Sequence, residues 1–148
     1  MATVAIVGAG LMGSALSFPL ADNGHTVHLV GTHLDDDIIR QCQATGIHPR
    51  LQRQLPASVK PFFVAGLAQA LEGVELVISG VSSPGVHWFA RTVGPHLRPG
   101  LPVLAVTKGL EATAEGDLRI LPDVVADELP PNLRGRVPIA AIGGPCIA

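Results

Sequence analysis

The sequence predicts an α/β fold in which helices cover both faces of a doubly wound, mostly parallel sheet. Short β-branched runs alternate with segments of helical length about five times, a glycine-rich turn follows the first run, and a further strand closes the series. This alternation is typical of parallel sheets joined by right-handed crossovers. Since no linker, repeat or low-complexity tract interrupts the 148 residues, we expect one domain over residues 1–148.

Apolar or β-branched runs predict the strands, and the first run is continuous enough to be buried on both faces. The runs lie at residues 3–7, 26–30, 59–64, 75–80, 102–106 and 138–142. The segments between them predict helices at residues 11–23, 32–45, 67–71, 84–97 and 117–128. Residues 47–58, which are rich in Pro, Gln and Arg, are expected to form a loop.

Glycine, proline and a capping pattern mark the ends of these helices. Gly24 and Gly46 follow the first two helices as C′ residues, and Pro84 suits an early helix position. Thr32 lies three residues before Asp35, which predicts a helix start resembling a capping box.

Composition excludes several classes of protein. With 47% apolar and 15% charged residues, the chain is not intrinsically disordered. A net charge of −2, a pI of about 6.3 and 3% aromatic residues argue against a nucleic-acid partner. Residues 1–21 are uncharged, but glycines and Pro19 interrupt them and no positive segment precedes them, so we expect neither a signal peptide nor membrane contact. Two cysteines far apart, Cys42 and Cys146, indicate a reducing compartment, and we expect a cytoplasmic protein.

The glycine-rich turn at residues 8–13 predicts a dinucleotide site. Gly8 permits a tight turn, Gly10 lets a pyrophosphate approach the backbone, and Gly13 allows the helix to pack closely on the strand. The N–H groups and dipole at the helix N-terminus favour phosphate. We therefore interpret the fold as Rossmann-like and residues 1–148 as a dinucleotide-binding domain. A strand–helix turn that merely needs glycine is the alternative.

The end of the second strand bears on the choice between NAD and NADP. Folds that prefer NAD place a carboxylate there, about 20 residues after the glycines, to bind the ribose 2′-hydroxyl. This chain has Gly31-Thr32-His33 and no acid before Asp35, so nothing there repels a 2′-phosphate. Thr32 can donate a hydrogen bond and His33 or Arg40 can add charge, which favours NADP. Alternatively, Thr32 only caps the next helix.

A lysine follows the fifth strand. Lys108, between Thr107 and Gly109, lies just after residues 102–106, at the strand edge where ligands bind in such sheets. Its ammonium can reach a carbonyl oxygen, a phosphate or the nicotinamide, and it can polarise a substrate oxygen or move a proton. A solvated loop lysine is the alternative, although the chain has only one other lysine, Lys60.

The remaining candidate site residues are expected to have structural roles. His25, His28 and His33 follow one strand and its exit on different faces without suitable partners, so we expect no metal site. Trp88 and Phe89 are expected in the core.

Three motifs in order resemble the NAD(P)-dependent glycerol-3-phosphate dehydrogenases. They are GAGLMGSAL at residues 8–16, TKGLE at residues 107–111 and GGPCIA at residues 143–148. The last two are similar to the family's Ser-Lys-Gly-Ile-Glu and Gly-Pro-Ser-Phe-Ala motifs. Ketopantoate reductases, an alternative, share the first motif but usually carry Asn-Gly in place of Lys108-Gly109. The resemblance implies an oxidoreductase that interconverts dihydroxyacetone phosphate and sn-glycerol 3-phosphate by hydride transfer with NAD or NADP.

The resemblance also implies roles for individual residues. Besides Gly8, Gly10 and Gly13, the positions that match the family's cofactor contacts are Leu11, Met12, Thr32, His33, Lys108 and Ala148. Those that match its substrate contacts are Lys108, Gly144 and Cys146, and Lys108 is the expected catalytic residue. Cys146 replaces the usual Ser or Thr and is a poorer donor. Thr32 replaces a common Arg, and IHPRL at residues 47–51 follows only loosely the family's Asn-containing, Tyr-Leu segment.

In this family a helical C-terminal domain follows the third motif and carries a second lysine, the proposed acid/base, with most contacts to the substrate phosphate. These 148 residues contain none of it, so we expect the chain to bind the dinucleotide but barely turn over. The expected partners are a phosphorylated small-molecule substrate and either a second copy of the chain or the family's C-terminal domain. A non-enzymatic dinucleotide-sensing module on the same fold is the alternative function.

Overall fold

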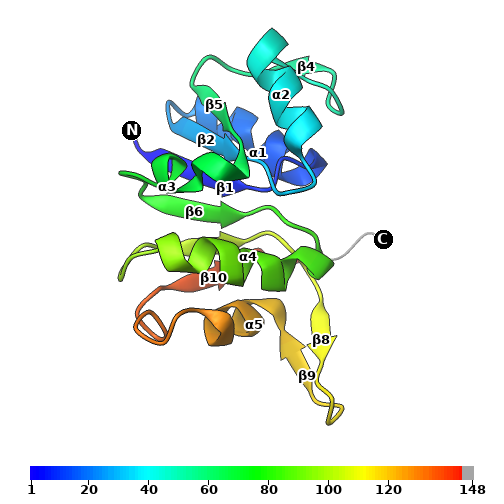
Figure 1. Ribbon diagram of the computed structural model, residues 1–148, viewed down its shortest axis with the longest axis vertical. Helices are drawn as coiled ribbons and strands as arrows, with labels where there is room; N and C mark the ends of the chain where they lie inside the picture. The colour runs from blue at the N-terminus through cyan, green and yellow to red at the C-terminus, as the bar shows by residue number, and fades with distance from the viewer. Residues whose placement is uncertain (145–148) are drawn as a thin grey trace.

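The structure, a computed structural model, describes residues 1–144 and is built on a six-stranded sheet (Figure 1). In spatial order the strands are β10 (Ile139–Ala141), β7 (Val103–Ala105), β6 (Leu76–Ser79), β1 (Thr3–Val7), β2 (Thr26–Val30) and β5 (Val59–Phe62). Every neighbouring pair is parallel. With these strands numbered along the chain, the order is the 3-2-1-4-5-6 of the Rossmann fold. The predicted doubly wound, parallel sheet is confirmed.

Helices cover both faces of the sheet, as predicted. One face carries α1 (Leu11–Asp22) and α2 (Asp36–Thr45). The other carries α3 (Leu67–Ala70), α4 (Val86–Val93) and α5 (Leu121–Glu128). In β1, Val4 and Ile6 belong to the first core, whereas Ala5 and Val7 belong to the second. Because side chains alternate across a strand, a continuous apolar run is buried on both sides.

The spacing of apolar residues decides which side of a helix faces the sheet. In α4, Val86, Phe89, Ala90 and Val93 recur at i, i+3, i+4 and i+7, and all four are buried. Phe89 is fully buried, as predicted for the core, and burying such a side chain contributes about 2–3 kcal/mol.

Two short hairpins replace segments that the sequence predicts differently. Within the expected loop, β3 (Ile47–His48) pairs with β4 (Arg53–Gln54). Farther along, β8 (Leu110–Ala112) pairs with β9 (Leu118–Ile120), so α5 begins at Leu121 rather than at residue 117. Pro122, in the first turn of α5, suits a start there. Strands of two or three residues are too short to show an alternation pattern, which is why the prediction missed them.

The other helix and strand boundaries differ less from the predicted ones. The helix predicted over residues 84–97 is divided into α4 and two flanking 3₁₀ turns, Ser83–Gly85 and Gly94–His96. Pro95 lies in the second turn and cannot extend the hydrogen-bond ladder of α4. None of the helices within residues 1–144 is long and apolar enough to cross a membrane.

The connections of the sheet reverse direction beside β1. From β1 the chain crosses through α1 to β2 on one side, whereas β6 lies on the other side. The amide of Gly8 donates to the Val30 carbonyl and the amide of Gly80 donates to the Val7 carbonyl, both at 2.8 Å. The carboxyl ends of β1, β2 and β6 therefore lie side by side at one edge of the sheet. In open α/β sheets, ligands bind in the crevice outside the carboxyl ends of the strands at such a point.

Candidate functional site

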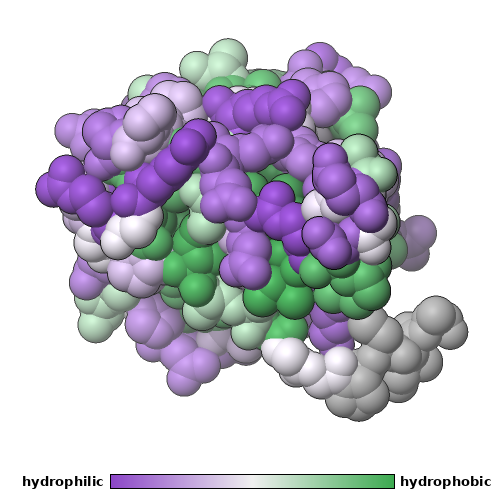
Figure 2. Space-filling view, turned by 90° about the horizontal axis from the view of Figure 1, so that it is seen from below, coloured by the Kyte–Doolittle hydropathy of each residue, from purple (hydrophilic) through white to green (hydrophobic). Residues whose placement is uncertain are grey.

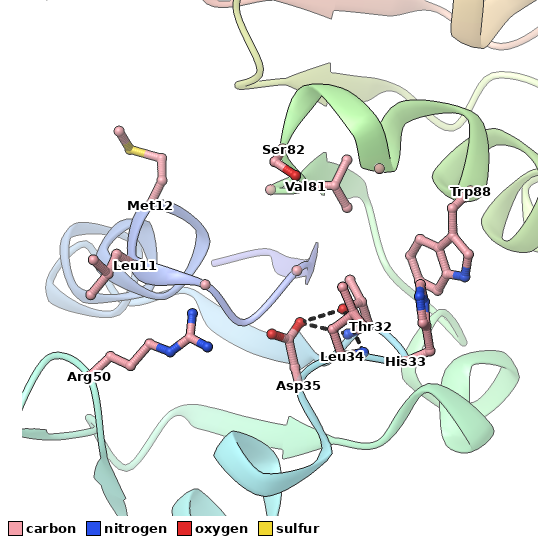
Figure 3. Close-up of a pocket in the computed structure, with 14 residues that line it drawn as sticks. Leu11, Met12, Thr32, His33, Leu34, Asp35, Arg50, Val81, Ser82 and Trp88 are labelled. Atoms are coloured by element: carbon pink, nitrogen blue, oxygen red, sulfur yellow. Dashed lines mark hydrogen bonds between the residues drawn. The ribbon is translucent and has the colours of Figure 1, made fainter. Parts of the chain in front are cut away.

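A cavity of about 400 Å³ opens at this point of the sheet (Figure 3). Its lining includes six residues that the sequence predicts as cofactor contacts, namely Gly8, Gly10, Leu11, Met12, Thr32 and His33. No binding role is predicted from the sequence for the rest of the lining, which is Leu34, Asp35, Arg50, Gly80, Val81, Ser82, Gly85 and Trp88. The strand-order rule could have indicated the loop after β6, but no local signal indicates Arg50.

The glycines of the turn have different structural roles. Gly8 has φ +116°, and a Cβ there would lie 2.7 Å from the backbone of Gly80. A Cβ on Gly13 would lie 2.1 Å from the carbonyl oxygen of Gly8, so Gly13 serves the close contact between α1 and β1 and does not line the cavity. A Cβ on Gly10 would meet no atom within 4 Å. The fold therefore needs Gly8 and Gly13, whereas a side chain at Gly10 would meet only open space.

The N-terminus of α1 is open to an anion. Gly10 is the N-cap residue, no side chain caps the helix, and its first turn contains no acidic residue. The first N–H groups of a helix have no partner within the helix, and the helix dipole favours negative charge there. A pyrophosphate above Gly10 would satisfy these groups.

Both backbone groups of Ala9 are held by side chains from other elements. Its amide donates to Oδ2 of Asp35 at 3.2 Å, and its carbonyl accepts from Nε2 of His48 at 3.0 Å. His48 is fully buried, and its Nδ1 accepts from the amide of Leu51 at 3.1 Å. Because Nδ1 accepts, the ring proton lies on Nε2. The glycine-rich turn is thus fastened to the start of α2 and to the β3–β4 hairpin.

Thr32 and Asp35 form a closed turn beside the cavity. The amide and the hydroxyl of Thr32 both donate to Oδ2 of Asp35 at 2.8 Å, and the hydroxyl accepts from the amide of Leu34 at 3.2 Å. The hydroxyl proton of Thr32 is therefore used within the protein, not presented to a 2′-phosphate as the sequence suggested. The predicted helix start at Thr32 is wrong: α2 begins at Asp36, its N-cap residue is Asp35, and no side chain caps it. Arg40 does not line the cavity, because it pairs with Asp37 at 2.5 Å on the exposed side of α2.

An aromatic pair closes the side of the cavity opposite Arg50 (Figure 3). The rings of His33 and Trp88 lie 5.4 Å apart between centroids at an angle of 46°. Trp88 is half-buried: it packs against the core, as predicted, and it also lines the cavity. The sequence predicted only the core contact, because no local pattern shows that α4 lies beside the end of β2.

A second cavity, of about 330 Å³, holds the predicted lysine. Lys108 and Gly144 both line it, and the Cβ position of Gly144 lies 3.9 Å from Nζ of Lys108. The hydroxyl of Thr107 donates to the carbonyl of Val81, which lines the first cavity, so the two sites adjoin. The structure brings two predicted substrate contacts together. The other two predicted contacts of this end of the chain, Cys146 and Ala148, lie outside the described residues.

An ion-pair cluster fastens the strand that follows Lys108. Nδ1 of His87 lies 2.7 Å from Glu128 and Nε2 lies 2.6 Å from Glu111. Carboxylates only accept hydrogen bonds, so both ring nitrogens carry protons. The hydrogen bonds to Glu128 and Glu111 raise the pKa of His87. Burial would raise the pKa of Glu128, but Arg91 and His87 lower it below its usual value.

The other histidines and the described cysteine have structural surroundings. His25 accepts from the amide of Ala2, and His28 lies 2.7 Å from the carbonyl of Ala70. Within residues 1–144, no three His, Cys, Asp or Glu side chains gather as metal ligands would. Cys42 lies in the core, and burial raises the pKa of its thiol.

Known proteins match the chain over almost its whole length. Residues 3–148 match the family described as the N-terminus of NAD-dependent glycerol-3-phosphate dehydrogenase. An NADP(+)-dependent glycerol-3-phosphate dehydrogenase of Archaeoglobus fulgidus is 40% identical over 98% of this chain and 42% of its own. A glycerol-3-phosphate dehydrogenase of Desulfitobacterium hafniense is 35% identical over 98% of this chain and 38% of its own.

Solved structures agree with the sequence matches. The crystal structure of glycerol-3-phosphate dehydrogenase from Coxiella burnetii superposes with a TM-score of 0.79 at 33% identity, over 97% of this chain and 41% of that one. The enzyme from Saccharomyces cerevisiae, at 16% identity and a TM-score of 0.75, shares the fold over 98% of this chain and 42% of its own. The chain thus spans about two-fifths of the length of the curated relatives it matches. Because the family match covers residues 3–148 and the relatives align over nearly the whole chain, the chain belongs to the NAD-dependent glycerol-3-phosphate dehydrogenase family and corresponds to the N-terminal part of those enzymes.

Proposed function

We propose that this chain is the coenzyme-binding part of an oxidoreductase that interconverts dihydroxyacetone phosphate and sn-glycerol 3-phosphate, with NAD or NADP as coenzyme. One observation carries the proposal: the space above Gly10 is empty of side chains, although Gly8 and Gly13 on either side of it are in tight backbone contact. Because Gly10 also lines the cavity at the uncapped start of α1, this opening leaves room for a phosphate group beside the helix N-terminus.

The residues around the first cavity fit a dinucleotide. The amides of Leu11 and Met12, at the uncapped start of α1, would hold the pyrophosphate. Thr32 and His33 would border the adenosine ribose, because they follow β2 directly. When bound, the coenzyme supplies or accepts a hydride, and the protein's part is to orient it and exclude water.

The second cavity fits a small phosphorylated substrate. Lys108 supplies a cation, and Gly144 keeps the backbone beside it open. In the direction of ketone reduction, this ammonium would polarise the carbonyl oxygen and stabilise the negative charge that develops on it. Lys108 is therefore the proposed catalytic residue. Cys146 and Ala148 are retained as proposed substrate and coenzyme contacts from the match to the family.

Apolar side chains border the Lys108 cavity. Leu110, Ile120 and Ile142 line this cavity and are 41–59% exposed, and green apolar surface borders the last described residues in Figure 2. Exposed apolar surface of this kind commonly contacts another protein surface. We propose that it contacts the helical domain that the family carries, or else a second copy of the chain. The proposed compartment is the cytoplasm, which agrees with the buried thiol of Cys42.

A coenzyme titration tests the proposal. Trp88 is the only tryptophan of the chain and lines the cavity, so its fluorescence reports binding directly. We expect NADPH or NADH to quench it in the wild type and in Lys108→Ala, but not in Gly10→Val, whose side chain fills the phosphate position. Gly66→Ala, remote from the cavity, is the control. Binding that ignores Gly10→Val would contradict the site assignment.

A turnover measurement tests whether the reaction needs the family's C-terminal domain in addition to this chain. We expect the 148-residue chain to consume NADPH with dihydroxyacetone phosphate far more slowly than a full-length relative, since most phosphate contacts of the family lie in the other domain. Full enzymatic rates from this chain would contradict the proposal.

A further inference from the structure

The coenzyme cavity contains one permanent positive charge among the described residues, and the sequence analysis did not include it. Among the residues that line the cavity, Asp35 is the only acidic residue and Arg50 is the only lysine or arginine. Arg50 enters from the β3–β4 hairpin, on the side of Asp35 opposite His33 and Trp88 (Figure 3). Its place in this site follows from the tertiary arrangement: a hydrogen bond between His48 and Ala9, which are 39 residues apart in sequence, joins the hairpin to the glycine-rich turn.

The carboxylate of Asp35 is engaged in hydrogen bonds within the protein. Its Oδ2 accepts three hydrogen bonds, from the amide of Ala9 and from the amide and hydroxyl of Thr32. Hydrogen bonds to a carboxylate oxygen stabilise its charge locally. Asp35 therefore holds the turn, and it differs from the carboxylate that ends the second strand in NAD-preferring folds and accepts from the ribose.

The guanidinium of Arg50, in contrast, is not engaged by another described residue. Arg50 is exposed and has no hydrogen bond or ion pair to any residue from 1 to 144. Every other arginine in that range has such a partner: a carboxylate, a backbone carbonyl or, for Arg53, the ring of Phe18. An unpaired guanidinium on the wall of a cavity is available to an anionic ligand.

The hairpin that carries Arg50 is held in place. His48, two residues before it, is fully buried and bonded to the Ala9 carbonyl. The amide of Gln52 donates to the carbonyl of His48 at 2.8 Å, which closes the tip around Arg50, and the amide of Leu55 donates to Gly46 at 2.8 Å. The backbone of Arg50 is therefore fixed relative to the glycine-rich turn, so less conformational entropy is lost when its side chain binds.

We propose that Arg50 is the specificity-determining residue of this site: its guanidinium binds the 2′-phosphate of the adenosine ribose and makes the chain prefer NADP(H) to NAD(H). The inference rests on the proposed function. The pyrophosphate already has the amides at the start of α1, whereas the ribose end, at Thr32 and Asp35, offers no other permanent cation among the described lining residues. A guanidinium makes two parallel hydrogen bonds to a phosphate, but it gains little from a neutral 2′-hydroxyl.

Paired titrations test the proposal. The full 148-residue chain is titrated with NADPH and with NADH, followed through Trp88 fluorescence, as wild type, Arg50→Gln and Arg53→Gln. Arg53 is the matched control, because it lies on the same hairpin but packs over Phe18 outside the cavity. We expect the wild type to bind NADPH at least about tenfold more tightly than NADH, the magnitude of one charge-assisted contact. Arg50→Gln should remove this difference by raising the Kd for NADPH alone, and Arg53→Gln should preserve it.

The outcomes separate this inference from the proposed function. An equal loss of both coenzymes in Arg50→Gln would place the guanidinium on the pyrophosphate and overturn the proposal, as would equal affinity of the wild type for NADPH and NADH. In either case dinucleotide binding, and with it the proposed function, would stand. If the wild type bound neither coenzyme, the proposed function would fail as well.

Discussion

Replacing Gly13 by alanine should destabilise the fold, because three backbone segments meet there without side chains between them. A Cβ on Gly13 would lie 2.1 Å from the carbonyl oxygen of Gly8, and real Cβ atoms essentially never come closer than 3.0 Å to another heavy atom. The N-terminus of α1 would have to move from the end of β1 by at least 0.9 Å. Gly80 restricts that movement, because its own Cβ position lies 3.0 Å from Cα of Gly13.

The size of the effect follows from this overlap. Overpacking by one methyl group in a well-packed interior costs about 1–3 kcal/mol, and a backbone-to-backbone overlap belongs at or above the upper limit. For a chain of about this length, each kcal/mol shifts Tm by roughly 2–4 °C. Gly13→Ala should therefore lower Tm by at least about 6–12 °C.

Gly10→Ala is the matched comparison, since it adds the same methyl group three residues earlier. Nothing lies within 4 Å of its Cβ, and its φ of −68° is accessible to alanine. Exchanging glycine for alanine at an N-cap costs about 1 kcal/mol at most, so Tm should fall by no more than about 4 °C. NADPH binding should nevertheless weaken by about tenfold or more, because the methyl group occupies the phosphate position.

Thermal unfolding, followed by circular dichroism and by Trp88 fluorescence, measures the difference. Gly66→Ala is the neutral control, because its Cβ would lie an ordinary 3.7 Å from Phe62. A Gly13→Ala variant that melts within about 2 °C of the wild type would refute the backbone-contact reasoning. So would a Gly10→Ala variant that loses as much stability as Gly13→Ala.

Three further predictions concern the residues around the site. His48→Ala should lower the free energy of unfolding by about 2–4 kcal/mol in urea titrations, because it leaves the Ala9 carbonyl and the Leu51 amide without partners. An unchanged midpoint of the urea titration would contradict the role of His48 in holding the hairpin on the glycine-rich turn. Phe89→Ala should cost about 3–5 kcal/mol in the same measurement, since the ring is fully buried, and a cost below 1 kcal/mol would show that this core is loosely packed. The raised pKa of His87 means that its ion pairs stabilise the fold fully below the ordinary histidine pKa of 6.5 and lose that effect as pH rises through the raised value. Stability measured from pH 5 to 9 should therefore fall more steeply above pH 6.5 in the wild type than in His87→Gln, and parallel curves would contradict the ion-pair assignment.

The order of elements was predictable because its signals are local. The apolar run at residues 3–7, the glycine that closes each of the first two helices and the alternation of strand and helix all concern neighbours in sequence. The β8–β9 hairpin was not predictable in this way. Leu118 and Ile120 are extended because they pair with Ala112 and Leu110, and a three-residue strand has no periodicity of its own.

Only part of the backbone contact at the glycine-rich turn could be predicted from neighbouring residues in the sequence. The tight turn at Gly8 and the close packing at Gly13 were both predicted and both hold in the structure. Gly80 belongs to the same backbone contact, yet it lies at the end of another strand and no motif includes it. The sequence has no acid before Asp35 at the end of the second strand, yet Asp35 itself lines the cavity and holds the turn at Thr32 and Ala9.

The parallel α/β architecture, the glycine-rich turn at residues 8–13 and the family could all be inferred from the sequence. These properties depend on the spacing of residues along one strand and one helix. Tertiary structure alone decided the neighbours of that site: Arg50 and Trp88 line the cavity because distant elements converge at the carboxyl ends of β1 and β6. The lining of the pocket therefore depends on contacts across the sheet edge, where separation in sequence carries no information about separation in space.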